Sequence, residues 1–360
     1  MSCKNEHGAY RVLEYKDTLY INKGLINSKC RVKTLSDNTY FEGYNKSENR
    51  IVLIDIDSSK EIFSVIPNIN YNSDSAGRFI QFDIYKIDSI FVITENNIFI
   101  VNEVGKVIYK KDVSEPIVDA EGSEYRLWDN DNQFPLYYDS NKKELLIRSI
   151  CNCSFMEPKY TSKRIEVKLN LVDDRISFFD YSFPERYKWN SYGQAVFPFR
   201  EINGETDVLS FPSDDTLYTF NRSSGKLKKI PCKSLYQESN FIPFDTNYSD
   251  DIERVKEHLT VIPMYQKILK DKYRGRYYRF FQKEQSLKDE KGEYRNLFDK
   301  DLVVMVLDTN FKVIQENNIG NSFFGFYSFV TPKGLYILKY DKQNLDSQKK
   351  YAIFSVFNWN

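Results

Sequence analysis

The segment from residue 265 to 283 interleaves lysine and arginine side chains with aromatic rings. Such a mixture can stack on bases or sugar rings while it neutralises phosphates or carboxylates. On a strand, alternate side chains point to opposite faces, so the same pattern also serves packing between neighbouring sheets. The candidate ligand-binding residues of this segment are Tyr273, Arg274, Arg276, Tyr277 and Arg279.

Two further stretches carry candidate binding residues. Trp128 opens a run in which Asp129 and Asp131 offer oxygen ligands at the alternating spacing of calcium loops, although the run lacks the glycine and distal glutamate of an EF-hand. An Asx turn is the alternative there. Trp189 and Tyr192 offer a surface on which a sugar ring stacks, with packing against the core as the alternative. We therefore expect no organic cofactor. Calcium bound by Asp129 and Asp131 is the one alternative.

The charge balance and motif content exclude several classes of protein. Lys and Arg total 51 and Asp and Glu total 51 among 360 residues, which excludes a generally basic nucleic-acid binder, so no nucleic-acid partner is expected. Two histidines and 14 glycines leave little material for histidine metal sites or phosphate loops. Nucleotide-binding, metalloprotease and serine-hydrolase motifs are all missing from the sequence. No linear motif nominates a catalytic residue.

The first residues predict where in the cell the protein is located. A small residue, Ser2, precedes Cys3, and polar residues follow, as at the junction of a bacterial lipoprotein. We interpret Met1 as a start codon that replaces a removed signal segment, residues 1–9 as a tether, and Cys3 as the lipidation site. The chain has no run of about 18 apolar residues, so we expect membrane contact through this anchor alone. A cytoplasmic protein with an ordinary cysteine is the alternative.

The remaining cysteines allow several pairings. Cys30, Cys151, Cys153 and Cys232 are compatible with none, one or two disulfides. Cys151 and Cys153 share a face of a strand, but a zinc site would need a second such pair. We expect buried free thiols.

A repeating unit organises the chain: a short β-branched or aromatic run, a polar turn, and a second run. Such units are hairpin signals, and their spacing of about 40–50 residues is typical of a β-propeller. The third strand of each unit begins near residue 51, 97, 165, 216, 302 or 351, which predicts six blades. A seven-bladed ring is the alternative, because the interval from 97 to 165 is long enough to contain another blade.

Closure of the ring requires one strand from the other end of the chain. The sixth unit lacks its outer strand, whereas the run 10–15 has no partner, so we predict that it completes the last blade and removes the exposed edges. The single propeller domain then spans 10–360. The run 194–199 is predicted as a strand of the fourth blade, and 249–259 as a helix capped by Ser249 that decorates the fifth blade (a helical insertion near 249–260).

One segment resembles a known family. Six-bladed, TolB-like propeller lipoproteins of the Bacteroidales type carry a similar pattern at this point, and the matching residues are Asp271, Tyr273, Arg274, Tyr277, Tyr278, Arg279 and Phe280. The resemblance implies a propeller fold, a lipid anchor and an envelope location, and it implies no catalytic residues.

Two functions follow as hypotheses. The first is a monomeric, non-catalytic binding or scaffolding propeller of the periplasm or cell surface, whose loops contact a glycan or an envelope protein partner. The second is a carbohydrate-active enzyme, a lyase or glycoside hydrolase, at the central channel. Two facing carboxylates about 5–10 Å apart in an open cleft would favour the enzyme. A channel closed by aromatic rings and Arg–Asp pairs would favour binding.

Overall fold

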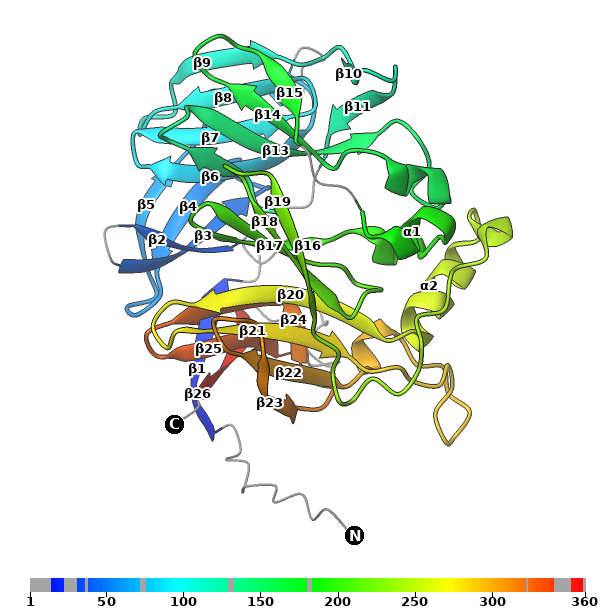
Figure 1. The fold of residues 1–360 in the computed structure, drawn as a ribbon. Helices are drawn as coiled ribbons and strands as arrows, with labels where there is room; N and C mark the ends of the chain where they lie inside the picture. The colour runs from blue at the N-terminus through cyan, green and yellow to red at the C-terminus, as the bar shows by residue number, and fades with distance from the viewer. Residues whose placement is uncertain are drawn as a thin grey trace.

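Six antiparallel sheets make up nearly all of the regular structure, and they follow one another along the chain. They are arranged as the blades of a six-bladed β-propeller (Figure 1), which confirms the predicted fold class. The computed structural model describes residues 14–22, 31–35, 38–71, 76–128, 133–179, 183–321, 323–339 and 351–358.

Blades 1 and 2 are regular four-stranded meanders in which each strand pairs with the next along the chain. In both, the second and third strands are rich in buried β-branched and aromatic residues, as expected for strands covered on two faces. The strands are β2 (Arg31–Leu35), β3 (Asn38–Asn45), β4 (Arg50–Asp55), β5 (Lys60–Val65), β6 (Phe79–Lys86), β7 (Ser89–Thr94), β8 (Asn97–Val101) and β9 (Val107–Asp112).

Blade 3 explains the long interval that left room for a seventh blade. Its second strand is paired on the inner side by two short strands, β11 near one end and β12 near the other. The additional residues therefore lengthen the inner edge of one sheet and do not form another blade. Its strands are β10 (Ile117–Val118), β11 (Glu124–Leu127), β12 (Tyr137–Asp139), β13 (Glu144–Cys151), β14 (Glu166–Asn170) and β15 (Ile176–Phe178).

Blades 4 and 5 again have four strands each, paired in chain order. They enclose the long connection that carries the helix α2 (Ile252–Val261). Their strands are β16 (Phe199–Asn203), β17 (Thr206–Ser210), β18 (Thr216–Asn221), β19 (Lys226–Pro231), β20 (Met264–Asp271), β21 (Arg276–Gln282), β22 (Leu302–Leu307) and β23 (Val313–Asn318).

Blade 6 joins the two ends of the chain, as predicted. It consists of β24 (Phe323–Thr331), β25 (Gly334–Lys339), β26 (Tyr351–Asn358) and, as its outer strand, β1 (Glu14–Asn22). β1 runs antiparallel to β26 and lies beside it in Figure 1. The closing strand therefore lies later than the predicted run 10–15, of which residues 10–13 are outside the described part of the chain.

Hairpin turns are fixed by the polar residues that the repeat placed there. In the β8–β9 turn, the Asn102 side chain accepts hydrogen bonds from the backbone of Val104 and Lys106. Asp308 does the same for Asn310 and Lys312 in the β22–β23 turn. These Asx-type bonds supply local partners for turn amides and end each strand at a defined residue.

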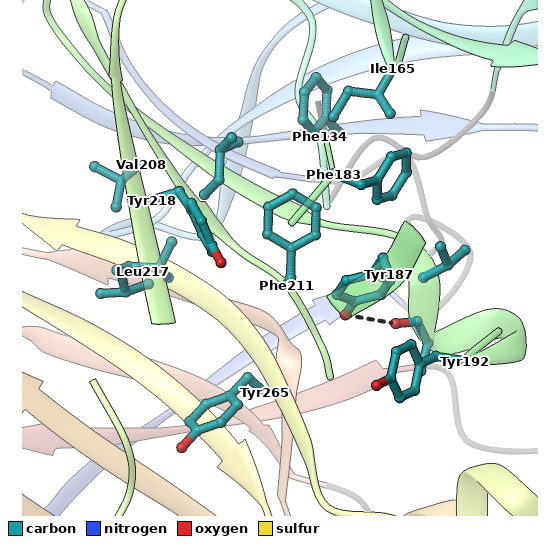
Figure 2. Close-up of a cluster of buried hydrophobic side chains, with 14 of the residues drawn as sticks. Phe134, Ile165, Phe183, Tyr187, Tyr192, Val208, Phe211, Leu217, Tyr218 and Tyr265 are labelled. Atoms are coloured by element: carbon teal, nitrogen blue, oxygen red, sulfur yellow. Dashed lines mark hydrogen bonds between the residues drawn. The ribbon is translucent and has the colours of Figure 1, made fainter. Parts of the chain in front are cut away.

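The core consists of apolar clusters between neighbouring blades. Blades 1 and 2 share a cluster that contains Leu53 and Phe82, and blades 6 and 1 share one that contains Ile21 and Phe41. Figure 2 shows the largest cluster, which extends from blade 3 to blade 5 and includes Phe211 on the β17–β18 connection. Because blade 6 packs on blade 1, the ring is closed by burial as well as by strand pairing.

The helical segments lie on one side of the propeller, where α1 and α2 are labelled in Figure 1. α2 is capped by Asp251, whose side chain accepts from two backbone amides, and not by the predicted Ser249. Its buried side packs on Met156 and Phe244, and its C-terminal end meets the β21–β22 connection of the fifth blade, where Lys300 donates to the carbonyls of Leu259 and Ile262. The helices are α1 (Glu185–Trp189), α2 (Ile252–Val261), η2 (Pro158–Ser162), η3 (Gly193–Val196), η4 (Thr246–Tyr248) and η5 (Leu297–Asp299).

The strand predicted over 194–199 is wrong. Residues Gly193–Val196 form the 3-10 helix η3, and β16 begins only at Phe199. Gly193 adopts a positive φ of 57°, which reverses the chain before the apolar run. Ala195 and Val196 are both buried from this helical turn, so their apolar character reflects the core and not a strand.

Candidate functional site

The central channel contains a pocket that all six blades line. Its volume is about 580 Å³, within the range of small-ligand sites. It opens at the face of the propeller that carries the turns between first and second strands, since Gly204 and Tyr273 belong to such turns. We call it the channel pocket; its charged and tyrosine lining residues are Arg31, Lys33, Asp83, Tyr85, Tyr137, Tyr138, Arg200, Glu201, Lys267, Lys270, Lys272 and Tyr273.

Charges from blades 1 and 2 neutralise one another on one wall. Arg31 of β2 forms ion pairs with the buried carboxylates Glu42 and Asp83, and Lys33 also pairs with Asp83. Burial alone would raise the pKa of Asp83, but attraction to Lys33 and Arg31 outweighs it and lowers that pKa below its usual value. This wall is an interblade ion-pair network that stays charged at neutral pH.

Arg200 of β16 belongs to a second, fully buried network. Its guanidinium pairs with Glu166 of blade 3, lies 4.0 Å from Asp207, and stacks 4.0 Å from the centre of the Phe134 ring. Asp207 also pairs with Arg222 at 3.1 Å. Arg200 therefore holds blade 4 against blade 3.

The wall formed by blade 5 carries three lysines, two of which donate to neutral oxygens. Lys267 donates to the backbone carbonyl of Ser328 in blade 6 at 2.9 Å. Lys270 donates to the side-chain oxygen of Asn203 in blade 4 at 2.6 Å. Lys272 lies 5.1 Å from the ring centre of Tyr273. We call Lys267, Lys270 and Lys272 the lysine ridge.

Glu201 of β16 is the carboxylate that faces the lysine ridge. It is partly exposed, and it takes part in none of the ion pairs found among the described residues. Burial raises the pKa of Glu201 to about 7, although Lys267 and Lys270 act in the opposite direction. Near neutral pH, the protonated and the ionised form of this carboxyl group are therefore present in comparable amounts.

Two contacts cross the channel between blades that are not neighbours. The hydroxyl groups of Tyr273 in blade 5 and Thr39 in blade 1 are 2.9 Å apart. Deeper in the channel, Phe199 of blade 4 and Phe326 of blade 6 meet edge to face, with ring centres 5.6 Å apart. The pocket therefore has a tyrosine at its mouth and aromatic rings beneath it.

Among the sequence-predicted site residues, Tyr273 lines the pocket, whereas Arg274, Tyr277 and Arg279 hold blades together. Arg274 pairs with Asp271 and donates to carbonyls of the β24–β25 turn. The Tyr277 hydroxyl accepts from Asn203 at 2.8 Å in a partly buried contact between blades 4 and 5. Arg276 begins β21 opposite Asp271 and does not line the pocket.

Arg279 is fully buried between blades 4 and 5. Its guanidinium donates to the carbonyl oxygens of Asp214, Asp215 and Cys232 and to the hydroxyl of Ser210. Because the N–H groups of this side chain already donate to acceptors inside the protein, Arg279 has a structural role in this fold.

The other candidates are not brought together. Trp189 is 78% exposed at the end of α1, whereas Tyr192 is 4% exposed and packs on Tyr187, so the two rings do not form one platform. Trp128 is partly buried against the largest core cluster. Asp129, Asp131 and the suspected lipidation residue Cys3 lie outside the described residues, so calcium binding and lipidation stay predictions.

The cysteines depart from the expected free thiols. Cys151 and Cys153 form a disulfide, with their Cα atoms 5.2 Å apart. A tight turn, in which the Cys153 amide donates to the Cys151 carbonyl, brings the two closer than the spacing of roughly 6.6 Å along a strand. Cys232 is a buried free thiol, and Cys30 lies outside the described residues.

Sequence reasoning missed most of the channel pocket as a site. Arg31, Lys33, Asp83 and Glu201 lie on the first strands of three different blades. The available signal was charge within the innermost strand of a repeat unit, where an ordinary buried strand would be apolar.

The described residues also limit two other possibilities. They contain no group of three or more histidine, cysteine, aspartate or glutamate residues arranged to hold a metal ion. None of the helices in the described part of the chain has the length and apolar character needed to cross a membrane.

The comparisons with known proteins agree with the geometry. A family model described as "Domain of unknown function (DUF4221)" matches residues 12–318. A DUF4221 structure from Bacteroides vulgatus superposes with a TM-score of 0.74 at 18% identity, covering 96% of this chain and 98% of that chain. A putative exported protein from Bacteroides fragilis gives a TM-score of 0.51 at 10% identity, covering 97% of this chain and 95% of that chain. No curated protein matches the chain.

At these identities the structural likeness shows the fold alone, whereas the family match rests on the sequence. It extends over most of the chain, from the closing strand β1 through blade 5. The resemblance to Bacteroidales-type propellers of uncharacterised function is thereby confirmed, while the lipoprotein part of it stays a prediction. The chain belongs to the DUF4221 family.

Proposed function

We propose that this protein is a non-catalytic ligand-binding propeller of the cell envelope, and that its channel pocket binds an acidic glycan fragment. The observation that carries the proposal is the lysine ridge, which places three cations along one wall of a ligand-sized pocket. Tyr85, Tyr137 and Tyr138 line the same pocket. Cations bind carboxylate or sulfate groups, and aromatic faces suit sugar rings.

An aromatic contact across the channel supports binding over passage of a substrate. The Phe199–Phe326 contact lies beneath the pocket, and the Arg31–Asp83 pair fixes its opposite wall. A pocket with rigid, ion-paired walls and one cationic side is preorganised for an anion, because it needs little rearrangement on binding.

Calorimetry with matched ligands tests this proposal. We expect a uronate oligosaccharide, such as digalacturonate, to bind at low salt, and its uncharged counterpart digalactose to bind at least tenfold more weakly. The variant Lys272→Gln should weaken digalacturonate binding, whereas Lys291→Gln, at an exposed lysine outside the pocket, should leave it unchanged. Equal affinity for the charged and uncharged sugars would reject an anion site.

The envelope location needs its own test, because it rests on the Ser2–Cys3 junction and on the family resemblance. The Bacteroides fragilis structural neighbour, described as a putative exported protein, is in keeping with such a location. Expression of the full-length gene with a labelled fatty acid should mark the protein, and Cys3→Ala should abolish the label. Labelling that survives this substitution would rule out Cys3 as the anchor.

Glu201 favours a second candidate function, a carbohydrate-active enzyme. A carboxyl group with a pKa of about 7 at the wall of an open pocket has the properties of a general acid. Mass spectrometry of acidic oligosaccharides incubated with the protein tests this candidate. Products that appear with the wild type and vanish with Glu201→Gln would replace the binding proposal by the enzyme.

A further inference from the structure

Glu201 lines the same pocket as the lysine ridge, on β16, which contacts β20. The side chain extends from β16 toward β20, where Lys267 and Lys270 attract its negative charge. Its neighbour Arg200 points to the other face of β16 and pairs with Glu166 in blade 3. The carboxylate of Glu201 therefore competes with any bound anion for the same two ammonium groups.

Other titratable groups face Glu201 from neighbouring strands and from across the pocket. On β21, burial raises the pKa of Tyr277, and the charge of Glu201 raises it further, so this phenol stays neutral. On β17, burial raises the pKa of Asp207, against the attraction of Arg200 and Arg222, but this side chain does not line the channel pocket. Across the pocket, Asp83 is held charged by Lys33 and Arg31. Glu201 is thus the group of this wall whose charge responds to an arriving anion.

Electrostatics then fixes the direction of the response. Two negative charges within a few ångströms of each other cannot both persist in a partly desolvated site, and the weaker acid takes up a proton. A uronate or sulfate group is a stronger acid than Glu201 in this environment, so the proton goes to Glu201. The protonated carboxyl group then has an O–H donor that can point to the bound anion.

We propose that Glu201 is the specificity-determining residue of the channel pocket: it takes up one proton from solvent when an anion binds to the lysine ridge and donates a hydrogen bond to that anion. This inference rests on the proposed function, since it needs an anion in the pocket. It predicts that the pocket prefers strong acids with an acceptor oxygen over neutral sugars, and that the preference sharpens as the pH falls.

Proton uptake makes the affinity depend on pH in a defined window. The free Glu201 carboxyl group titrates near pH 7, and the bound anion moves that titration to higher pH. Above pH 7, Glu201 must therefore take up a proton from solvent when the anion binds. The affinity for the anion then falls as the pH rises, by up to about tenfold for each pH unit when one proton is taken up. Below pH 6, Glu201 is already protonated and affinity becomes independent of its titration.

Calorimetry in two buffers measures this proton directly. Inorganic sulfate and digalacturonate serve as probes, because neither takes up a proton between pH 6 and 8.5. At pH 7.5, the difference in binding heat between triethanolamine and Tris buffers, neither of which supplies an oxyanion of its own, should correspond to between half and one proton taken up per anion. A wild-type protein that binds either anion without proton uptake would overturn the inference while leaving the anion site in place.

The variant Glu201→Gln supplies the complementary measurement. Glutamine keeps the shape and an N–H donor, so we expect anion binding to persist, the proton uptake to vanish, and the affinity to stay at its low-pH value up to pH 8.5. The matched control is Glu103→Gln, at an exposed position outside the pocket, which should keep the wild-type uptake. Proton uptake that persists in Glu201→Gln would assign the proton to another group and contradict the inference. Absence of binding by the wild type at every pH would instead reject the anion site itself, and the inference with it.

Discussion

The guanidinium carbon of Arg279 lies 3.7 Å from the centre of the Tyr265 ring, and both side chains are buried from solvent. The ring covers one face of the cation, while carbonyl oxygens from blade 4 receive its N–H groups. A cation that is stacked and hydrogen-bonded in this way fixes the position of blade 5 against blade 4.

Arg279→Ala should therefore destabilise the protein strongly. Removal of the guanidinium leaves several buried carbonyls without donors and a cavity beside Tyr265, which together cost about 3 kcal/mol or more. Urea unfolding followed by tryptophan fluorescence measures the loss. Arg276→Ala, on the same strand but partly exposed, should change stability by less than about 1 kcal/mol. Equal effects of the two substitutions would contradict the structural position of Arg279.

Ile21 tests the closure of the ring. This side chain of β1 is 3% exposed and packs in the cluster shared by blades 6 and 1. Ile21→Ala should lower the free energy of unfolding by about 2–5 kcal/mol, because it leaves a cavity at the joint. Val104→Ala, at a side chain that is 74% exposed, is the control and should be nearly neutral. A neutral Ile21→Ala would mean that β1 contributes little to closure.

Gly105 and Gly204 separate backbone strain from steric overlap. Both have a positive φ, 80° and 57°, so alanine is strained at either position. At Gly105 the new Cβ would also lie 2.2 Å from the backbone oxygen of Ile66, whereas at Gly204 nothing lies within 4 Å. We expect Gly204→Ala to cost about 1 kcal/mol and Gly105→Ala clearly more, as thermal unfolding can show. The reverse order would be incompatible with the packing of the β8–β9 turn on blade 1.

Lys300 gives the fold a pH dependence. Burial lowers its pKa from the usual 10.5 to about 7, and its ammonium group donates to backbone carbonyls at the end of α2. Between pH 7 and 10.5 the unfolded chain binds the proton that the folded chain releases, so this residue makes stability rise with pH. Below pH 7 its contribution no longer changes.

Lys300→Met should remove that slope. The difference in unfolding free energy between wild type and Lys300→Met should shift in favour of the wild type as the pH rises from 7 to 9.5, in urea titrations at each pH. Lys291→Met, at an exposed lysine, should show no such trend. A constant difference would show that Lys300 keeps its proton in the folded protein throughout this range.

The fold was accessible from the sequence because its signals are local. Each third strand begins close to the predicted residue, since β-branched runs and Asx turns act within a few residues of one another. The failures are also local in origin. The apolar run around Ala195 and Val196 has the composition of a strand, and only the positive φ of Gly193 and the core around it make it helical.

The site was not accessible, because it depends on contacts between distant parts of the chain. Lys33 and Lys267 face one pocket only because the ring closes. Trp189 and Tyr192 are three apart and would share a face on a continuous helix, but α1 ends at Trp189 and Asn190 is extended, so the two rings diverge. No sequence pattern places the carbonyls of Asp214 and Cys232 around Arg279.

Pairing of β1 with β26 also sets the order in which the protein can be made. The partner of Asn22 is Tyr351, so the first strand leaves the ribosome about 330 residues before its partner exists. At the usual speed of translation, that interval lasts tens of seconds. Throughout it, the nascent propeller has an unpaired edge at each end, and it completes its last blade only after β26 has been made. The connectivity of blade 6 therefore determines how long the unpaired edges are exposed to chaperones, proteases and other nascent chains.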